Sequence, residues 1–182
     1  MQHAGLPWAW RWLKPCCLFW RYLTINTRTL YLLLNRDRST DIMMALQGHV
    51  PDFAVFGDDY DTPDGTAIRD YIHVTDLAAA HVQALKLLLE GHSGGAFNLG
   101  TGKGFSVQDI LAAIATETGR HVPHVVKPRR SGDPTYLVAD PSAARATLNF
   151  RPAHSDLATI IRTAWAWHNK AHPLKTGAPV RK

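Results

Sequence analysis

Residues 53–85 read FAVFGDDYDTPDGTAIRDYIHVTDLAAAHVQAL, and this stretch decides the fold. It opens with a short apolar run, Phe53 to Phe56, that is typical of a strand. Two turns rich in Gly, Asp and Pro follow, and residues 69–74 then predict a second extended segment. Asp76 is suited to cap a helix over residues 77–90, which are rich in Ala and Leu. The alternation of strands and helices predicts an α/β fold.

The chain beyond this stretch continues the same alternation. A strand over 96–99 stops at a Gly-rich turn, and Ser106 with Asp109 has the spacing of a capping box for a helix that ends near Gly119. Strands are predicted over 122–126 and 136–139, and the first is expected to be an edge strand or a short one because it contains Pro123. Asp140 is predicted to cap a short helix, and Ser155 or Asp156 to cap a last one over 157–169. We therefore predict one α/β domain over residues 43–172, followed by a basic tail over 173–182.

The first 42 residues differ in composition from the rest. Residues 1–36 contain no Asp or Glu, yet they hold four of the six Trp and both Cys. Arg11, Lys14 and Arg21 interrupt the apolar residues, which argues against a secretory signal and against a membrane span. We interpret residues 1–42 as a divergent segment that is either disordered or translated out of frame. A membrane anchor on a soluble domain is the alternative.

The overall composition excludes several classes of protein. The chain has 182 residues, a formal net charge of +5 and 46% hydrophobic residues, which excludes a disordered polyelectrolyte. Its two cysteines are adjacent, so they form neither a disulfide framework nor a zinc-binding CxxC pair. The mild positive charge permits an anionic ligand and does not indicate nucleic acid. These features favour a reducing, cytoplasmic location.

Most motifs that suggest catalysis have a simpler interpretation. Residues 100–104 read GTGKG, a spacing that departs from the G-x-G-x-x-G dinucleotide fingerprint, so we expect a tight turn of small residues. The pairs His121/His124 and His168/His172 have metal-ligand spacing but lack a third ligand, and we expect no metal site. We expect His73, between a strand and a helix, to have a hydrogen-bonded structural role.

Three residues have the chemistry of a nucleotide-diphosphate site. Arg69 and Arg130 come from distant segments, and arginine presents a planar fork to phosphate oxygens. Asp133, three residues beyond Arg130, has the carboxylate that accepts hydrogen bonds from a ribose diol. The alternative is that the arginines form ordinary surface salt bridges.

Several long stretches of the sequence are similar to those of a known protein family. Besides 53–85, they are AFNLGTGKGFSVQDI at 96–110, PRRSGDPTYLVADPSAA at 128–144, and the shorter LNFRP and AWAWH. From about Met43 to Lys170 the chain resembles the C-terminal part of the UDP-glucose 4-epimerases. These are extended short-chain dehydrogenases/reductases of the NAD(P)-binding Rossmann superfamily. The resemblance implies an α/β substrate-binding domain, truncated relative to the family because its N-terminal Rossmann part is missing.

The resemblance also implies a chemistry and a set of site residues. Such isomerases interconvert UDP-glucose and UDP-galactose through a transient 4-keto sugar, using bound NAD and a tyrosine base, and are commonly homodimers. Arg69 and Arg130 match the family's diphosphate-binding arginines, and Asp133 matches its ribose-binding carboxylate. The positions that hold the uracil ring match Ala54 and Phe56, and those that line the sugar pocket match Tyr136 and Leu137. A UDP-pentose or N-acetylhexosamine 4-epimerase is an open alternative.

The chain departs from the family in its catalytic parts. No tyrosine is followed four residues later by lysine, so the Y-x-x-x-K pair is absent, and so is a G-x-x-G-x-x-G fingerprint. The family's dimer-forming helices belong to the missing part, which puts a homodimer in doubt. We therefore expect the isolated chain to bind no NAD, to lack a catalytic residue and to be inactive. A non-catalytic UDP-sugar-binding remnant is the corresponding hypothesis, with no nucleic-acid or membrane partner.

Overall fold

The structure is a computed structural model that describes residues 23–25 and 38–171. It confirms the α/β class. In chain order the elements are β1 (Leu23–Ile25), α3 (Arg38–Leu46), β2 (Phe53–Phe56), β3 (Ile68–Asp70), α4 (Val74–Leu89), β4 (Gly95–Phe97), β5 (Gly104–Ser106), α5 (Val107–Thr118), β6 (His124–Lys127), β7 (Tyr136–Leu137), α6 (Ser142–Thr147) and α7 (Leu157–Ala171). Most of the divergent segment and the basic tail lie outside the described residues.

The strands form three small sheets. β2 pairs with β6 and β1 with β4, both parallel, while β3 lies between antiparallel β5 and parallel β7. Among the described strands, β6 pairs only with β2, which agrees with the predicted edge or short strand, and Pro123 lies directly before β6 and not within it. In β2 the side chains alternate, so Phe53 and Val55 are buried in the core while Ala54 and Phe56 are half-buried on the opposite face.

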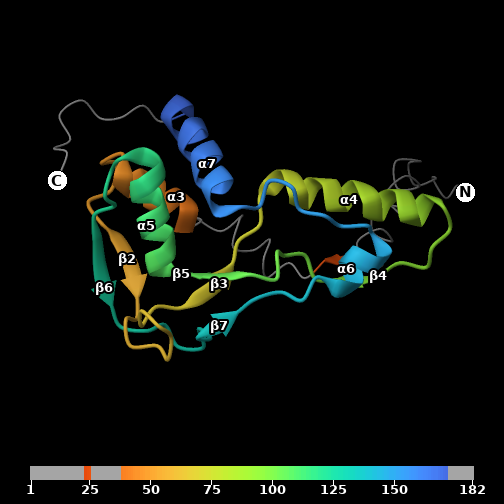
Figure 1. The fold of residues 1–182 in the computed structure, drawn as a ribbon, viewed down its shortest axis with the longest axis horizontal. Coiled ribbons are helices and arrows are strands. Elements are labelled where there is room, and N and C mark those ends of the chain that lie inside the picture. The colour runs from red at the N-terminus through yellow and green to blue at the C-terminus, as the bar shows by residue number, and fades with distance from the viewer. Residues whose placement is uncertain (1–22, 26–37, 172–182) are drawn as a thin grey trace, which may run out of the picture.

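The molecule is elongated and has a hydrophobic core at each end. Figure 1 shows α3, α5, α7, β2 and β6 gathered at one end and α4, α6 and β4 at the other. The first core includes Met43, Val55 and Ile114, and the second includes Ala84 and Phe150. The predicted domain boundary at Met43 falls within α3, whose side chains already contribute to the first core.

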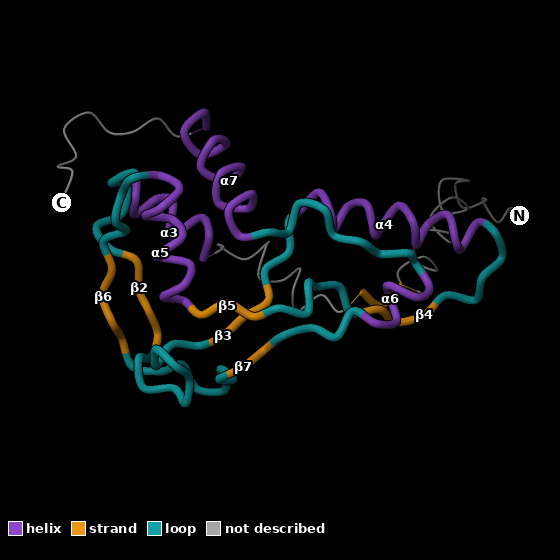
Figure 2. Tube along the Cα trace, in the orientation of Figure 1, coloured by secondary structure: helices purple, strands orange, loops and turns teal. Residues whose placement is uncertain are grey.

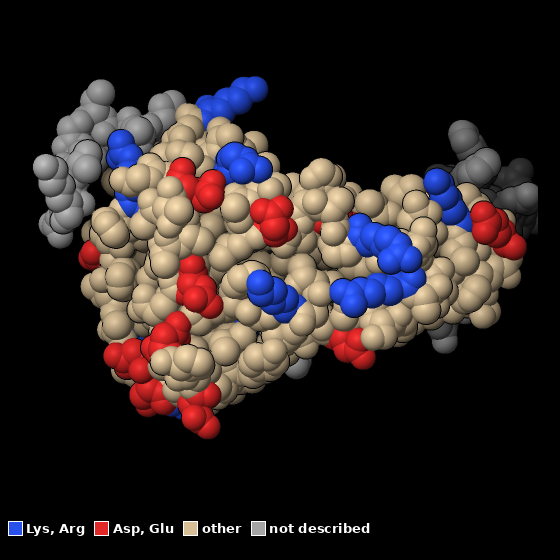
Figure 3. Space-filling model, in the orientation of Figure 1, with Lys and Arg blue, Asp and Glu red and all other residues tan. Residues whose placement is uncertain are grey.

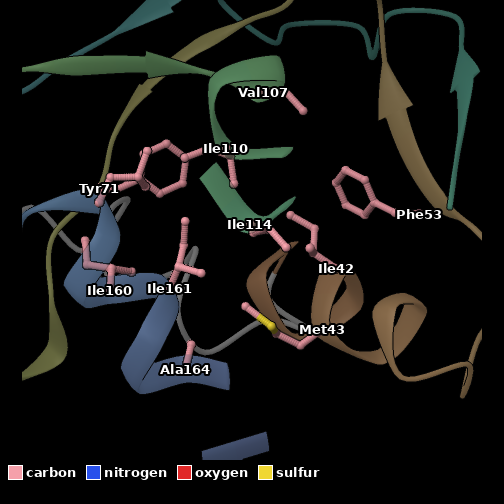
Figure 4. Close-up of a pocket in the computed structure, with 11 residues that line it drawn as sticks. Ile42, Met43, Phe53, Tyr71, Val107, Ile110, Ile114, Ile160, Ile161 and Ala164 are labelled. Atoms are coloured by element: carbon pink, nitrogen blue, oxygen red, sulfur yellow. The ribbon is translucent and has the colours of Figure 1, made fainter. Parts of the chain in front are cut away.

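The first core encloses a small apolar cavity. It has a volume of about 60 Å³ and lies between α3, α5 and α7, as Figure 4 shows. Ile42, Phe53, Ile114 and Ile161 are among the apolar side chains that line it. Tyr71 is the one lining residue with a polar side-chain group, which is too few to orient a nucleotide, so the candidate site lies elsewhere.

Side chains join two of the connections that run between the ends of the molecule. Residues 71–73 lead into α4 and residues 148–156 lead into α7, and the two run side by side in Figure 2. The His73 N–H donates to Ser155 Oγ at 2.9 Å, and its ring Nε2 lies 2.9 Å from Thr163 Oγ1 in α7. The structural role predicted for His73 is confirmed.

Local capping explains where the helices begin and end. The Ser106–Asp109 capping box is confirmed, and Gly119 ends α5 with a φ of 68°. Asp156, and not Ser155, accepts from the Thr159 N–H at the start of α7. The short helix α6 begins at Ser142 with Pro141 as its N-cap and no side-chain capping bond, so the predicted cap at Asp140 is one residue too early; Asp140 accepts from the Ser142 N–H just inside the helix.

The predicted start of α4 at Asp76 is wrong. The helix begins at Val74, which lies at the end of the predicted extended segment, and His73 is the N-cap because its Nδ1 accepts from the Thr75 N–H. The Asp76 carboxylate instead accepts from the Ala153 N–H at 3.1 Å, the His154 N–H at 2.9 Å and Ser155 Oγ at 2.5 Å. Asp76 therefore ties α4 to the connection that precedes α7.

We expect this anchor to make the protein sensitive to acid. Burial acts to raise the Asp76 pKa, but the hydrogen bonds from Ser155, His154 and Ala153 outweigh it and hold the pKa below its usual value. As the pH falls, Asp76 is protonated first in the unfolded chain, at a pH of about 4. Its contribution to stability should therefore be complete above that pH and be lost as the pH drops through the folded-state pKa. Urea unfolding from pH 6 to pH 3 should show this loss, and Asp76→Asn should make the decline shallower. An unchanged slope in the variant would contradict the assignment.

Candidate functional site

A tight turn after β6 places two of the predicted site residues at its ends. The Asp133 N–H donates to the Arg130 carbonyl at 3.2 Å, which closes a four-residue turn. Gly132 occupies the third position with a φ of 77°, a conformation that glycine adopts without strain. The turn therefore fixes Arg130 and Asp133 at a short separation while both side chains project from the same loop.

Arg130 lies across the ring of Phe56. Because β2 and β6 are parallel and Phe56 pairs with Lys127, the two strands end together and the chain after β6 passes back over the end of β2. The Arg130 guanidinium carbon is 3.7 Å from the Phe56 ring centroid, a stacked cation–π contact. Ala54 shares this face of β2 with Phe56. The structure thus brings Ala54, Phe56 and Arg130 together.

Arg69 is fully engaged inside the protein. Its guanidinium forms an ion pair with Asp133 at 2.5 Å and donates to the Ile68 carbonyl at 2.6 Å, and the residue is only 6% exposed. A third bond, to the Thr135 carbonyl at 3.4 Å, joins β3 to the segment before β7. The sequence predicted that Arg69 and Arg130 act alike, but here Arg69 orients Asp133 while Arg130 is exposed.

The residues predicted to line the sugar pocket lie on β7. Leu137 is 45% exposed and pairs in register with Arg69, and Tyr136 is 60% exposed. They therefore stand beside the strand that holds the Arg69–Asp133 pair. The six predicted site residues therefore lie on β2, on the parallel pair β3 and β7, and in the turn at 130–133 that leads from β6 to β7.

The Gly-rich turn at 100–104 is occupied by the protein itself. The Asp70 carboxylate accepts from the Thr101 N–H at 3.0 Å, Thr101 Oγ1 at 2.6 Å and the Gly102 N–H at 3.0 Å. A Cβ at Gly100 would lie 2.5 Å from an Asp70 oxygen and 2.6 Å from the Ala139 Cβ. This confirms the prediction of a tight turn of small residues. The N–H groups that would cradle a pyrophosphate already bind a carboxylate.

No cluster of metal ligands is present within residues 38–171. His121 and His124 belong to no group of three or more potential metal ligands among these residues, and His172 lies outside the described residues. No described helix is long and apolar enough to span a membrane.

The sequence analysis did not predict the contacts of Arg129, a second arginine beside the site. Arg129 Nε donates to Asp59 Oδ1 at 2.6 Å, a second guanidinium nitrogen donates to the Asp59 carbonyl, and the guanidinium carbon is 4.2 Å from the Tyr60 ring centroid. The turn that contains Asp59 is acidic, with exposed Asp58, Asp61 and Asp64. Figure 3 shows acidic side chains gathered at this end of the molecule. The adjacent pair Arg129-Arg130 was the one sequence signal for the contacts of Arg129.

Comparison with known proteins supports the resemblance drawn from the sequence. The NAD dependent epimerase/dehydratase family matches residues 35–100. A UDP-glucose 4-epimerase from Lactobacillus helveticus is 48% identical over 121 residues, covering 66% of this chain and 36% of that protein.

Two crystal structures show the same similarity in three dimensions. UDP-glucose 4-epimerase from Brucella ovis, in complex with NAD, has 53% identity and a TM-score of 0.66 over 69% of this chain and 39% of its own. The enzyme from Stenotrophomonas maltophila, with bound NAD and formylated UDP-arabinopyranose, has 41% identity and a TM-score of 0.71 over 74% of this chain and 40% of its own. The chain therefore spans about two fifths of the length of these proteins.

Proposed function

We propose, on the premise that the chain resembles UDP-glucose 4-epimerases over about two thirds of its length, that it binds the uridine diphosphate portion of a UDP-sugar. The observation that carries the proposal is the turn at 130–133. It presents an exposed arginine over an aromatic ring at one end and an oriented carboxylate at the other. The solved relative that contains formylated UDP-arabinopyranose supports this class of ligand.

Each residue of the site has a distinct role in the proposal. Arg130 donates to the diphosphate directly, because its guanidinium is exposed and forms no ion pair within residues 38–171. Asp133 accepts from the ribose hydroxyls. Arg69 holds Asp133 in position and adds its charge to the same region. Ala54 and Phe56 face the uracil ring, and Leu137 lies where the sugar would extend.

The proposal does not assign epimerase catalysis to residues 1–182 alone. The relatives' names place the resemblance among isomerases, and their structures contain NAD. In this chain the Gly-rich turn is filled by the Asp70 carboxylate, and no Tyr-x-x-x-Lys pair exists to supply a base. The described residues therefore do not fit a dinucleotide, and we propose a non-catalytic UDP-sugar-binding polypeptide. NAD absorbance or UDP-glucose/UDP-galactose turnover by the purified chain would overturn this part.

Ligand-binding variants should separate the proposed roles. Each charge-assisted hydrogen bond to phosphate contributes about 1.5–3 kcal/mol. Arg130→Ala should therefore weaken UDP binding by roughly tenfold to a hundredfold and leave uridine binding unchanged. Asp133→Asn should weaken both ligands, since both contain the ribose. Arg69→Ala should resemble Asp133→Asn, because it removes the partner of that carboxylate. Titration calorimetry with the two ligands measures each effect.

Arg151→Ala is a matched control for the loss of charge. Arg151 is also exposed but follows Phe150 of the second core, away from the turn at 130–133. It should leave both affinities unchanged. Equal losses of UDP and uridine affinity in Arg130→Ala would mean that Arg130 supports the fold and does not bind phosphate.

A further inference from the structure

We propose that Arg129 is a positioning residue for this site: by clamping the turn at 57–60 to the loop after β6, it holds Arg130 across Phe56. The inference rests on the proposed UDP binding and adds a residue to it. Arg129 would bind no ligand itself. Its effect would pass entirely through the neighbouring arginine.

The first support is the way in which the two arginines divide their contacts. Both leave the end of β6, and both reach the chain that leaves the end of β2. Arg130 stacks on Phe56, the last residue of β2, while Arg129 reaches Asp59 and Tyr60 three and four residues further on. Arg129 directly precedes Arg130 in the chain, so a fixed Arg129 restricts the direction in which Arg130 enters the turn at 130–133.

The second support is that Arg129, although itself partly exposed, packs against a buried residue. Tyr60 is 4% exposed, and its N–H donates to the Gly65 carbonyl, so the surface against which Arg129 packs cannot shift freely. Gly57 continues the pairing of the strands by donating to the Lys127 carbonyl at 2.8 Å. It also leaves room for the Arg129 stem: a Cβ at Gly57 would lie 2.7 Å from Arg129 Cγ and 2.6 Å from Tyr60 Cε2.

The third support is electrostatic. The hydrogen bond from Arg129 lowers the pKa of Asp59, which favours the ionised carboxylate beside Arg129. Asp59 is the ion-pair partner of Arg129, and Asp133 is the ion-pair partner of Arg69. Of these three arginines, Arg130 alone has no ion-pair partner among the described residues. The pairing leaves the exposed guanidinium of Arg130 available to an anionic ligand.

Two substitutions distinguish positioning from a direct attraction between Arg129 and phosphate. Arg129→Lys keeps the charge but cannot bond the Asp59 carboxylate and carbonyl together through a planar fork. Positioning predicts that it weakens UDP binding by roughly threefold to tenfold, whereas direct attraction predicts no loss. Asp59→Ala removes a negative charge near the ligand. Positioning predicts weaker UDP binding, and direct attraction predicts stronger binding.

A double-mutant cycle then tests whether the effect passes through Arg130. In the Arg130→Ala background, Arg129→Lys should cause no further loss of UDP affinity, and uridine binding should not change in any of these variants. Urea unfolding should show that each variant is folded at the temperature of the titration, and Arg151→Lys is the control for an exposed arginine elsewhere.

The outcomes separate this inference from the proposed function. If the unmodified chain binds UDP no better than uridine, the proposed function fails and the inference fails with it. If Arg130→Ala weakens UDP but Arg129→Lys and Asp59→Ala do not, the proposed function stands and the inference alone is overturned. Losses that add in the double variant would likewise overturn it.

Discussion

Replacing Gly65 with alanine is expected to destabilise the protein by about 3–5 kcal/mol, a large fraction of the stability of a typical single domain. Gly65 has a φ of 76°, which a residue with a Cβ adopts only under strain. Its new Cβ would also overlap the Asp58 carbonyl oxygen and lie 2.8 Å from the carbonyl carbon. Both atoms belong to the backbone, so they cannot move aside as a flexible side chain would.

Gly132→Ala is the control that separates strain from overlap. Gly132 has nearly the same φ, 77°, but nothing lies within 4 Å of a Cβ built there. Gly132→Ala should lower the free energy of unfolding only through backbone strain, by about 1–2 kcal/mol. The midpoints of urea unfolding for the two variants measure the difference. Equal midpoints would contradict the proposed overlap in the turn at 57–65.

The second large effect is expected from Asp70→Asn. The Asp70 carboxylate accepts hydrogen bonds from two segments, the Gly-rich turn at residues 101 and 102 and, at 3.4 Å, the Ala139 N–H. An asparagine has the same shape, but its NH₂ group would face N–H donors. Since hydrogen bonds to a charged group contribute about 1.5–3 kcal/mol each, we expect the free energy of unfolding to fall by roughly 3–4 kcal/mol.

Asp140→Asn is a matched control for this prediction. Asp140 accepts from the N–H and Oγ of Ser142 only two residues away, at the surface, so its replacement should have a much smaller effect. Chemical denaturation of both variants at neutral pH provides the comparison. A loss in Asp70→Asn no greater than in Asp140→Asn would mean that this carboxylate does not hold the two segments together.

Patterns that act within one turn of the chain were predicted well from the sequence. The Ser106–Asp109 capping box and the final Gly119 of α5 needed only neighbouring residues, and so did the strand over Phe53–Phe56. The tight Gly-rich turn followed from the spacing of its glycines. For these elements the local backbone preference and the final packing agree.

Partners that are distant in the sequence could not be predicted. An aspartate in the first turn of a helix looks the same whether it caps that helix or, like Asp76, accepts from a segment 77 residues away. Arg69 was expected to face a ligand, but its partner Asp133 lies 64 residues further along the chain. Arg129 and Asp59 are 70 residues apart in the sequence, and the only sign of their contact in the sequence is the adjacent arginine pair. Tertiary structure, and not local propensity, decides which charges meet.

The central claim is that the turn at 130–133 recognises the diphosphate of a uridine nucleotide. The most direct test is to titrate the unmodified chain with UDP and with uridine at matched, low ionic strength. The account predicts that UDP binds about tenfold to a hundredfold more tightly, and that added salt reduces this difference because charged contacts cause it. Equal affinities for the two ligands, or no binding of either, would contradict the account.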